Sequence, residues 1–178
     1  MTRHGDARTR PSEARVVTVA ILLVANEGAV EGGSGQALAE RCAVLGHEVL
    51  KRLVLPPDRE SIEAQLRAWI AEESIDVVVV MGAVGVTPSD VAPEAVRAVL
   101  ERELPGFGEA VRRAHEREIG HRAVHGRELG GVSGGSFVFA LSAEHESLVR
   151  AWDSVLGELL DPSAEASLIP LLPALAIS

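Results

Sequence analysis

The chain has 178 residues and a mass of 18.8 kDa, enough to bury most of its apolar surface in one core and too short to expect two. Hydrophobic residues make up 47% of it and charged residues 24%, which excludes a largely disordered chain. The formal net charge of -9 and the presence of only two Trp and three Phe argue against a nucleic-acid binder, which needs a basic surface.

The amino-terminal residues carry no targeting or membrane signal. The first fifteen residues hold no apolar stretch, and the first apolar run, Val16 to Ala25, is too short to span a bilayer. We therefore expect a cytoplasmic protein without a membrane segment, with a flexible arm over residues 1–15. The single cysteine, Cys42, cannot form an internal disulfide, and its place in a helical apolar pattern indicates core packing.

Strand and helix patterns alternate through the first half. Val16 to Val24 is a continuous aliphatic run typical of a central parallel strand. A Gly-rich loop, AVEGGSGQ, follows, and Ser34 is placed to cap a helix that Gly46 ends. Glu48 to Leu55 is predicted to be a second strand. The segment LPPDRESIEAQLRAWIAEE predicts an amphipathic helix, which then leads to VVVVM, a third buried strand.

Beyond the third strand, the pattern predicts a loop from Gly82 to Asp90, a helix to about Leu104 and another helix from Phe107 to about Ile119. This order is typical of a parallel sheet with right-handed crossovers. Gly120 to Gly135 holds six glycines and no helical period, so we expect short strands and turns at one edge of the sheet.

The carboxyl-terminal part begins with SFVFAL, Ser136 to Leu141, which is predicted to be another buried strand. One apolar stripe then predicts a long helix ended by Asp161 and Pro162; it consists of Leu148, Trp152, Val155, Leu156 and Leu159. The tail SLIPLLPALAIS is apolar and broken by prolines, so we expect it to be too irregular for a helix and to pack on the domain surface or on a neighbouring subunit. These patterns give one domain over residues 16–162 and a tail over 163–178.

The loops after the parallel strands are the expected place for a ligand, because ligands of such sheets bind beyond the carboxyl ends of the strands. The loop after the third strand, MGAVGVTPSDVAPEA, puts Gly82 and Gly85 where a backbone can approach an anion. For the two glycines taken alone, a tight turn that needs a positive φ is the plainer explanation.

Several motifs in the same order resemble one family. They are SGQAL (34–38), GHEV (46–49), DVVVVMG (76–82), DVAPEAV (90–96) and ELPGFGE (103–109). They resemble MoaB and MogA, proteins of molybdenum cofactor biosynthesis. The resemblance implies a three-layer α/β/α molybdopterin-binding fold with a mainly parallel sheet, and a homotrimer or a hexamer. It also implies that molybdopterin is the ligand or substrate, and that active members adenylylate its terminal phosphate with Mg and ATP.

The resemblance also assigns site residues. Asp90 matches the family's catalytic carboxylate and would hold Mg, although a carboxylate near a helix N-terminus is the plainer explanation of this residue alone. Asp58 stands near the family's second acidic position and is carried over as a second catalytic residue. The implied ligand-binding residues are Ser34, Gly35, Gly82, Ala83, Val84, Gly85, Ser142, Ala143 and Glu144.

The ligand loops depart from the family pattern. Where the family reads GGTG and then RDVTPEA, Val84 replaces a threonine, Ser89 an arginine and Ala92 the threonine that would cap a helix beginning at Pro93. The family's last loop, LPGSP, is replaced by LSAEHE. Two carboxylates, Glu144 and Glu146, would then lie near a phosphate and repel it by about 1 to 3 kcal/mol.

A second group of polar residues invites a metal interpretation. His115, His121 and His125 cluster with Glu116 and Glu118, but their spacings match no known zinc site, so a solvated helix end is expected. The sequence contains no Walker loop and no GxGxxG motif.

Two functional hypotheses follow. The first is a molybdenum cofactor biosynthesis protein that binds molybdopterin, with Mg- and ATP-dependent adenylylation if the chain is active. The alternative is a noncatalytic paralogue that kept the fold and the oligomer and serves as a binding or scaffold protein. In both, self-association into a trimer or hexamer would cover apolar surface, including the tail from Leu168 to Ile177.

Overall fold

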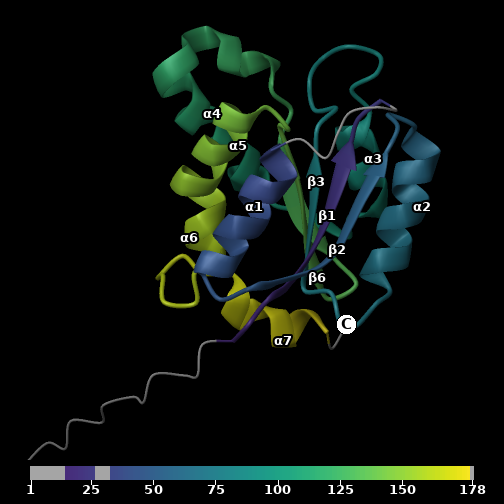
Figure 1. Cartoon of the computed structure of the whole chain (residues 1–178), viewed down its shortest axis with the longest axis vertical. Helices are drawn as coiled ribbons and strands as arrows, with labels where there is room; N and C mark the ends of the chain where they lie inside the picture. Colours follow the sequence, from purple (N-terminus) through teal and green to yellow (C-terminus); the bar gives the residue numbers. More distant parts are fainter. Residues whose placement is uncertain (1–14, 27–32, 177–178) are drawn as a thin grey trace, which may run out of the picture.

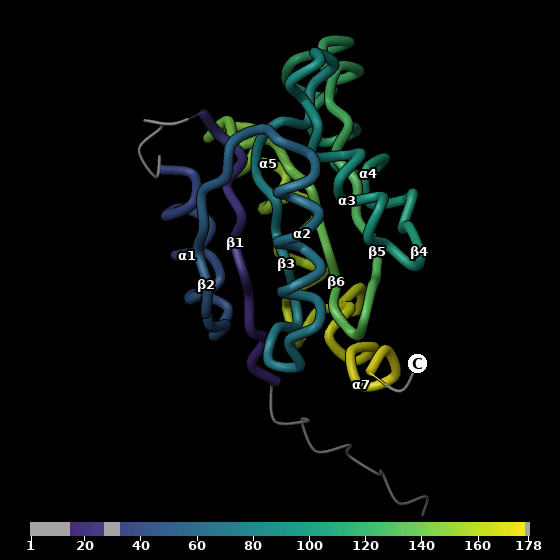
Figure 2. Tube along the Cα trace, turned by 90° about the vertical axis from the view of Figure 1, so that its right-hand side faces the viewer, coloured from purple at the N-terminus to yellow at the C-terminus, as the bar shows by residue number. Residues whose placement is uncertain are grey.

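A mostly parallel β-sheet runs through the middle of the computed structural model, which describes residues 15–26 and 33–176. Figure 2 shows its strands side by side in the order β2-β1-β3-β6-β5-β4. The first four of these are parallel, and β5 is antiparallel to both β6 and β4. The bounds are β1 Thr18–Val24, β2 Glu48–Leu55, β3 Val77–Met81, β4 Arg102–Glu103, β5 Leu129–Ser133 and β6 Ser136–Leu141. Residues 1–14 of the predicted arm and the first half of the Gly-rich loop, residues 29–32, lie outside the described residues.

Helices cover both faces of the sheet and give the expected three-layer α/β/α fold (Figure 1). One layer contains α1 Gly33–Val44, α4 Pro105–Ile119, α5 His145–Ala151 and α6 Gly157–Leu160; the other contains α2 Arg59–Ile70 and α3 Ala92–Val99. Every residue of β3 is buried. Because neighbouring residues of a strand point to opposite faces, Val77 and Val79 join one core while Val78 and Val80 join the other.

The edge that carries β4 differs from the prediction. The helix expected to reach Leu104 ends at Val99, because Leu100 takes an extended conformation, with φ -72° and ψ 136°. The next residues form β4, which pairs with β5. The short strands predicted within Gly120 to Gly135 include β5, preceded by a 3-10 helix, η1 Gly120–His125. Two glycines with positive φ then turn the chain from β5 into β6.

The long helix predicted after β6 is present but is interrupted by a π-helical turn, η2 Trp152–Leu156, between α5 and α6. Its predicted stripe faces the core, where Leu148, Trp152, Val155 and Leu156 are buried. A π-helical turn adds one residue to the helical repeat, which the side-chain pattern alone did not reveal.

The carboxyl-terminal tail is more regular than expected. It forms a 3-10 turn, η3 Ile169–Leu171, and a short helix, α7 Leu172–Leu175, so the prediction that it is too irregular for a helix is wrong. Ile169 and Leu172 are 4% and 2% exposed and belong to the core of their own domain. Within the described residues, no helix is long and apolar enough to cross a membrane.

His47, from the GHEV motif, joins the beginning of the sheet to the end of α6. Its Nδ1 accepts a hydrogen bond from the Val17 N–H at 3.3 Å, and its Nε2 donates to the Leu160 carbonyl at 2.6 Å. The residue is 6% exposed. One imidazole therefore satisfies two backbone groups from segments more than one hundred residues apart.

We expect His47→Ala to lower the free energy of unfolding by about 2 to 4 kcal/mol, because it leaves both backbone groups without their partner in a buried place. Urea denaturation followed by circular dichroism measures this change. His121→Ala is the matched control, since the His121 side chain is fully exposed, and it should change stability by less than about 0.5 kcal/mol. Equal effects of the two variants would contradict the assignment.

Candidate functional site

Three strand ends meet at Gly82, the first residue after β3. Its N–H donates to the Leu141 carbonyl at 2.9 Å, at the end of β6. A Cβ at this position would lie 2.6 Å from the Val24 carbonyl oxygen at the end of β1, and Gly82 has a φ of 95°. Only glycine fits this place, so it brings the ends of β1, β3 and β6 into contact.

Ser34 ties the first helix to the loop after β6. Its hydroxyl donates to the Ala143 carbonyl at 2.6 Å, and Ala143 lies 3.4 Å from the position of a Cβ at Gly82. Ser34 is the second residue of α1, which begins at Gly33, so the expectation that it caps this helix is wrong. The structure therefore brings together Ser34, Gly82 and Ala143, three of the predicted ligand-binding residues; Gly35 is buried one residue further along α1.

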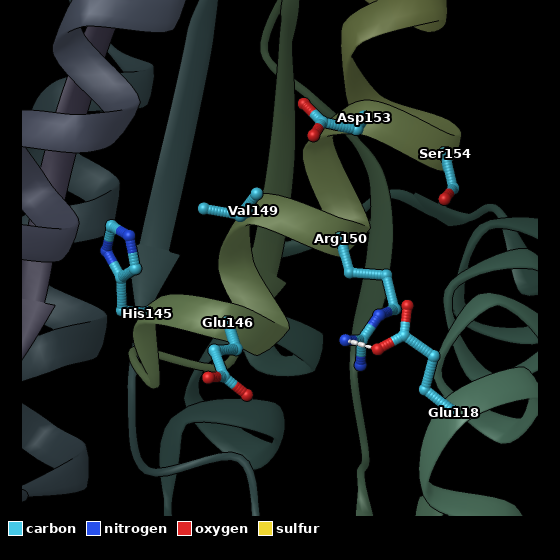
Figure 3. A pocket seen from close by; sticks show the side chains of 7 residues that line it. All are labelled: Glu118, His145, Glu146, Val149, Arg150, Asp153 and Ser154. Atoms are coloured by element: carbon cyan, nitrogen blue, oxygen red, sulfur yellow. Dashed lines mark hydrogen bonds and ion pairs between the residues drawn. The ribbon is translucent and has the colours of Figure 1, made fainter.

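The loop after β6 is held by its own side chains. The Glu144 N–H donates to the Ser142 hydroxyl at 3.2 Å, and the Glu144 carboxylate accepts from the Ser147 hydroxyl at 2.8 Å. Glu146 instead lines a hollow of about 350 Å³ between α4 and α5, where Glu118 and Arg150 form an ion pair (Figure 3). Of the two carboxylates expected to repel a phosphate, Glu144 is the one within this loop.

The central loop closes around Asp90. The Asp90 Oδ2 accepts from the Thr87 N–H at 2.8 Å and from the Thr87 hydroxyl at 2.6 Å. A Cβ at Gly85 would lie 2.7 Å from the same oxygen. Ala83 has a positive φ of 52°, and its carbonyl accepts from the N–H of Ala92, the first residue of α3. The loop thus brings Gly85, Thr87 and Asp90 together.

Side chains of the central loop explain the departures from the family pattern. Val84, which stands in place of a threonine, is 6% exposed and packs in the core between the sheet, α2 and α3. The helix expected to begin at Pro93 begins at Ala92, and Val91, its N-cap residue, makes no capping hydrogen bond through its side chain. Pro93 in the first turn needs no hydrogen-bond partner there, which lowers the cost of the missing cap.

Asp90 is ionised at neutral pH. Partial burial raises the pKa of its carboxyl group, but hydrogen bonds from the side chain and backbone of Thr87 and from the backbone of Gly85, with the charge of Arg127, outweigh it and hold the pKa below its ordinary value. The site therefore contains a fixed negative charge at the start of α3.

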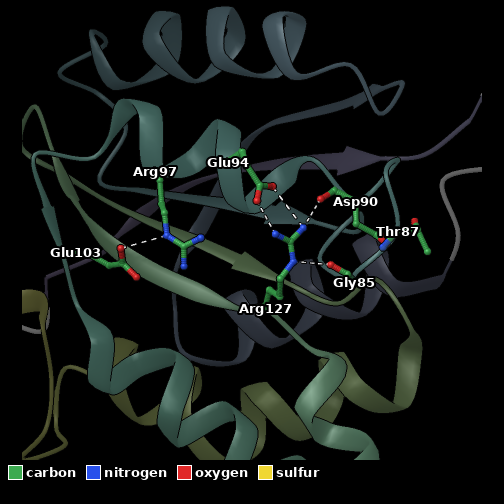
Figure 4. A network of polar contacts seen from close by, with 7 residues as sticks. All are labelled: Gly85, Thr87, Asp90, Glu94, Arg97, Glu103 and Arg127. Atoms are coloured by element: carbon green, nitrogen blue, oxygen red, sulfur yellow. Dashed lines mark hydrogen bonds and ion pairs between the residues drawn. The ribbon is translucent and has the colours of Figure 1, made fainter.

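Arg127, which the sequence reasoning did not single out, connects the central loop to α3 (Figure 4). Its Nε donates to the Gly85 carbonyl at 2.5 Å, its Nη2 to the Asp90 carbonyl, and its Nη1 to the Glu94 carboxylate at 2.5 Å. The hydrogen bond from Arg127 lowers the pKa of Glu94 against a smaller opposing effect of burial. The sequence did offer one signal for Arg127, which is its position just before a strand that runs antiparallel to its neighbour. Such a strand starts at the edge where the parallel strands end, which is where a ligand site is expected.

A cavity of about 530 Å³ lies beside this network, within the size range of small-molecule sites. Its lining is Arg59, Val86, Thr87, Pro88, Asp90, Val91, Glu94 and Arg127. Both arginines are already paired, Arg59 with Glu63 at 2.6 Å and Arg127 with Glu94. A bound anion must therefore compete with carboxylates of the chain itself.

Asp58 lies at the start of α2 and acts as its N-cap. Its carboxylate accepts from the Ser61 hydroxyl at 2.5 Å and from the Ser61 N–H at 2.9 Å. These two hydrogen bonds lower the pKa of Asp58. The neighbouring Arg59 lines the cavity that contains Asp90, and a catalytic role for Asp58 stays a prediction.

The prediction that the histidine cluster forms one solvated helix end is wrong for His115. His115 is 4% exposed; its Nε2 donates to the Ser147 carbonyl at 3.1 Å, and its Nδ1 lies 3.8 Å from the Glu128 carboxylate. Its position on α4 turns it inward, whereas the His121 side chain is fully exposed. Within residues 15–26 and 33–176, no group of three or more His, Cys, Asp or Glu side chains could hold a metal ion. A divalent cation at Asp90 would thus need further oxygen ligands from a bound phosphate, as Mg²⁺ commonly uses.

Comparisons with known proteins agree with this geometry. Residues 15–162 match the model of a family described as a probable molybdopterin binding domain. Molybdenum cofactor biosynthesis protein B of Escherichia coli K12 is 34% identical over 144 residues, 80% of this chain and 85% of that protein. A crystal structure of molybdenum cofactor biosynthesis protein B superposes with a TM-score of 0.78 at 29% identity, over 93% of this chain and 97% of the other. The molybdopterin biosynthesis enzyme MoaB from Thermus thermophilus gives 0.76 at 26% identity, over 92% and 98%. The chain therefore belongs to the molybdopterin-binding domain family that includes the molybdenum cofactor biosynthesis proteins B.

Proposed function

We propose that this protein acts in molybdenum cofactor biosynthesis, in the cytoplasm, by binding molybdopterin at the edge of the sheet where β1, β3 and β6 end. The observation that carries the proposal is the convergence of Ser34, Gly82 and Ala143 at one point, with the ionised Asp90 in the loop that Gly82 begins. The carboxyl edge of a parallel sheet, where these three strand ends meet, is the usual place for a phosphate-bearing ligand in such folds.

Different residues of the site would bind the phosphate and the cation. The Ser34 and Thr87 hydroxyls donate to the Ala143 carbonyl and to the Asp90 carboxylate, so they would have to exchange these hydrogen bonds in order to donate to a phosphate. Asp90 would hold Mg²⁺, since both hydrogen bonds from Thr87 go to Oδ2 and Oδ1 keeps lone pairs for a cation. When bound between Asp90 and phosphate oxygens, Mg²⁺ would neutralise charge on ATP and on the pterin phosphate.

Binding without adenylylation is the version of this function that the site favours. Glu144 places a negative charge in the loop after β6, and Asp58 is engaged as a helix cap. Arg59 and Arg127 are each paired with a carboxylate of the chain. These features favour binding of molybdopterin without Mg- and ATP-dependent catalysis.

Removing the charge of Glu144 should strengthen ligand binding. We expect Glu144→Gln to raise the affinity for molybdopterin by about tenfold, because it removes a like charge while keeping an oxygen that accepts from Ser147. Anaerobic titration calorimetry measures the change. Glu146→Gln removes the same charge from the hollow between α4 and α5 and should have the smaller effect. Weaker or unchanged binding by Glu144→Gln would sink the repulsion argument.

Asp90 separates the two versions of the function. We expect the wild type to bind molybdopterin but to show no Mg- and ATP-dependent adenylylation in a turnover assay that detects the adenylylated pterin. Asp90→Asn should then weaken molybdopterin binding in the presence of Mg²⁺ and change the stability by less than about 1 kcal/mol, through the helix N-terminus and the Thr87 contacts, with no turnover to lose. Turnover by the wild type that Asp90→Asn abolishes would instead make the protein an enzyme.

Self-association into a trimer or hexamer is also part of the proposal. Among the described residues, exposed apolar side chains include Val44, Val86 and Val124, which are 86%, 66% and 67% exposed. The tail contributes less than expected, since Ile169 and Leu172 are buried in its own domain. Multi-angle light scattering at micromolar concentration should give the mass of three or six chains. A monomer under these conditions would refute this part of the proposal.

A further inference from the structure

Two consecutive residues, Arg127 and Glu128, lie between the central loop and the loop after β6. They precede β5, which is antiparallel to β6, so they lie at the edge where β6 ends. Neighbouring residues of an extended segment point to opposite faces of a sheet. Arg127 accordingly contacts Glu94 on α3, while Glu128 faces His115 on α4.

Arg127 forms hydrogen bonds with both the beginning and the end of the central loop. Its N–H donates to the Val84 carbonyl at 2.9 Å, and its guanidinium donates to the carbonyls of Gly85 and Asp90. The Glu94 carboxylate binds the remaining side of the guanidinium (Figure 4). A planar guanidinium can serve these three acceptors at once, whereas the ammonium group of a lysine is a single point of charge.

Glu128 reaches the other loop through a short relay of contacts. Its side chain is 4% exposed and lies 3.8 Å from Nδ1 of His115, whose Nε2 donates to the Ser147 carbonyl. The Ser147 hydroxyl in turn donates to the Glu144 carboxylate. Two glycines make room for Glu128: a Cβ at Gly126 would clash with its Oε2, and one at Gly108 would clash with its carbonyl oxygen.

We propose that Arg127 and Glu128 are a pair of positioning residues, in which Arg127 fixes the central loop and the backbone of Asp90, and Glu128 fixes the start of α5 and the loop before it through His115. Neither residue needs to touch the reacting atoms for this role. The claim that the positioned loops receive molybdopterin rests on the proposed function, whereas the positioning itself is a property of the protein without ligand.

Hydrogen–deuterium exchange of the ligand-free protein, read by mass spectrometry, tests the first half. We expect Arg127→Lys to speed exchange in residues 83–91 by about tenfold or more, with exchange in α1 and α2 unchanged. Arg97→Lys is the matched control: Arg97 also lies in the α3 network and pairs with one carboxylate, Glu103, at 3.3 Å (Figure 4). It should leave residues 83–91 as they are in the wild type.

Substitution of Glu94, the carboxylate on α3 that pairs with Arg127, tests the same network through its acceptor. Glu94→Gln keeps an acceptor for the Arg127 Nη1 and should raise exchange in residues 83–91 less than Glu94→Ala does. Glu128→Gln tests the other half and should speed exchange in residues 142–148 but not in 83–91. Each variant therefore serves as the control for the loop that the other one affects.

Three results would overturn the proposal: unchanged exchange in both loops, equal acceleration by Arg97→Lys and Arg127→Lys, or acceleration throughout the chain, which would indicate a role in global stability only. Titration with molybdopterin adds a second measurement, in which Arg127→Lys should weaken binding by about tenfold while Arg97→Lys does not. If the wild type binds no molybdopterin, the proposed function fails, and the exchange data still decide whether Arg127 and Glu128 position the loops.

Discussion

Burial of β3 between two helical layers is the constraint from which the rest of this structure follows. A strand covered on both faces must satisfy all its backbone groups through its neighbours, and β3 does so by parallel pairing with β1 and β6. Parallel neighbours end at the same edge, so three chain segments must leave the sheet in a small space. Gly82 makes this exit feasible because its missing side chain leaves room for the Val24 carbonyl.

The polar groups that gather at this edge are already satisfied by one another. Asp90 binds Thr87, Arg127 binds Glu94, Arg59 binds Glu63 and Glu144 binds Ser147. Hydrogen bonds and ion pairs of this kind hold the side chains in defined positions, which reduces the ordering cost of binding. The same contacts must be exchanged for contacts with the ligand, so a molecule with several phosphate oxygens and its own cation has an advantage over a single small anion.

Much of the fold was predictable because hydrophobic patterns are local. The run from Glu48 to Leu55 predicted the observed bounds of β2, and VVVVM predicted β3. Errors arose where distant contacts overrode a local pattern. Ser34 donates to Ala143 rather than capping α1, the residues after Val99 leave the helix to pair with β5, and His115 is turned inward against Ser147. Arg127 was missed because its partners are separated from it by 33 to 42 residues.

In the hairpin of β5 and β6, the number of residues in β5 determines which face of the sheet the side chains before it point to. Gly134 and Gly135 close the hairpin, and the five residues of β5 lie between this turn and the pair Arg127 and Glu128. Side chains alternate along a strand, so one inserted or deleted residue in β5 would exchange the two faces. The acid would then point at the carbonyl oxygens of the central loop, and the guanidinium would be buried against the imidazole of His115. The residue count of this strand is therefore constrained in addition to its amino-acid identities, of which Gly130 and Gly131 are already restricted by close contacts with the Phe139 ring and the Arg102 carbonyl.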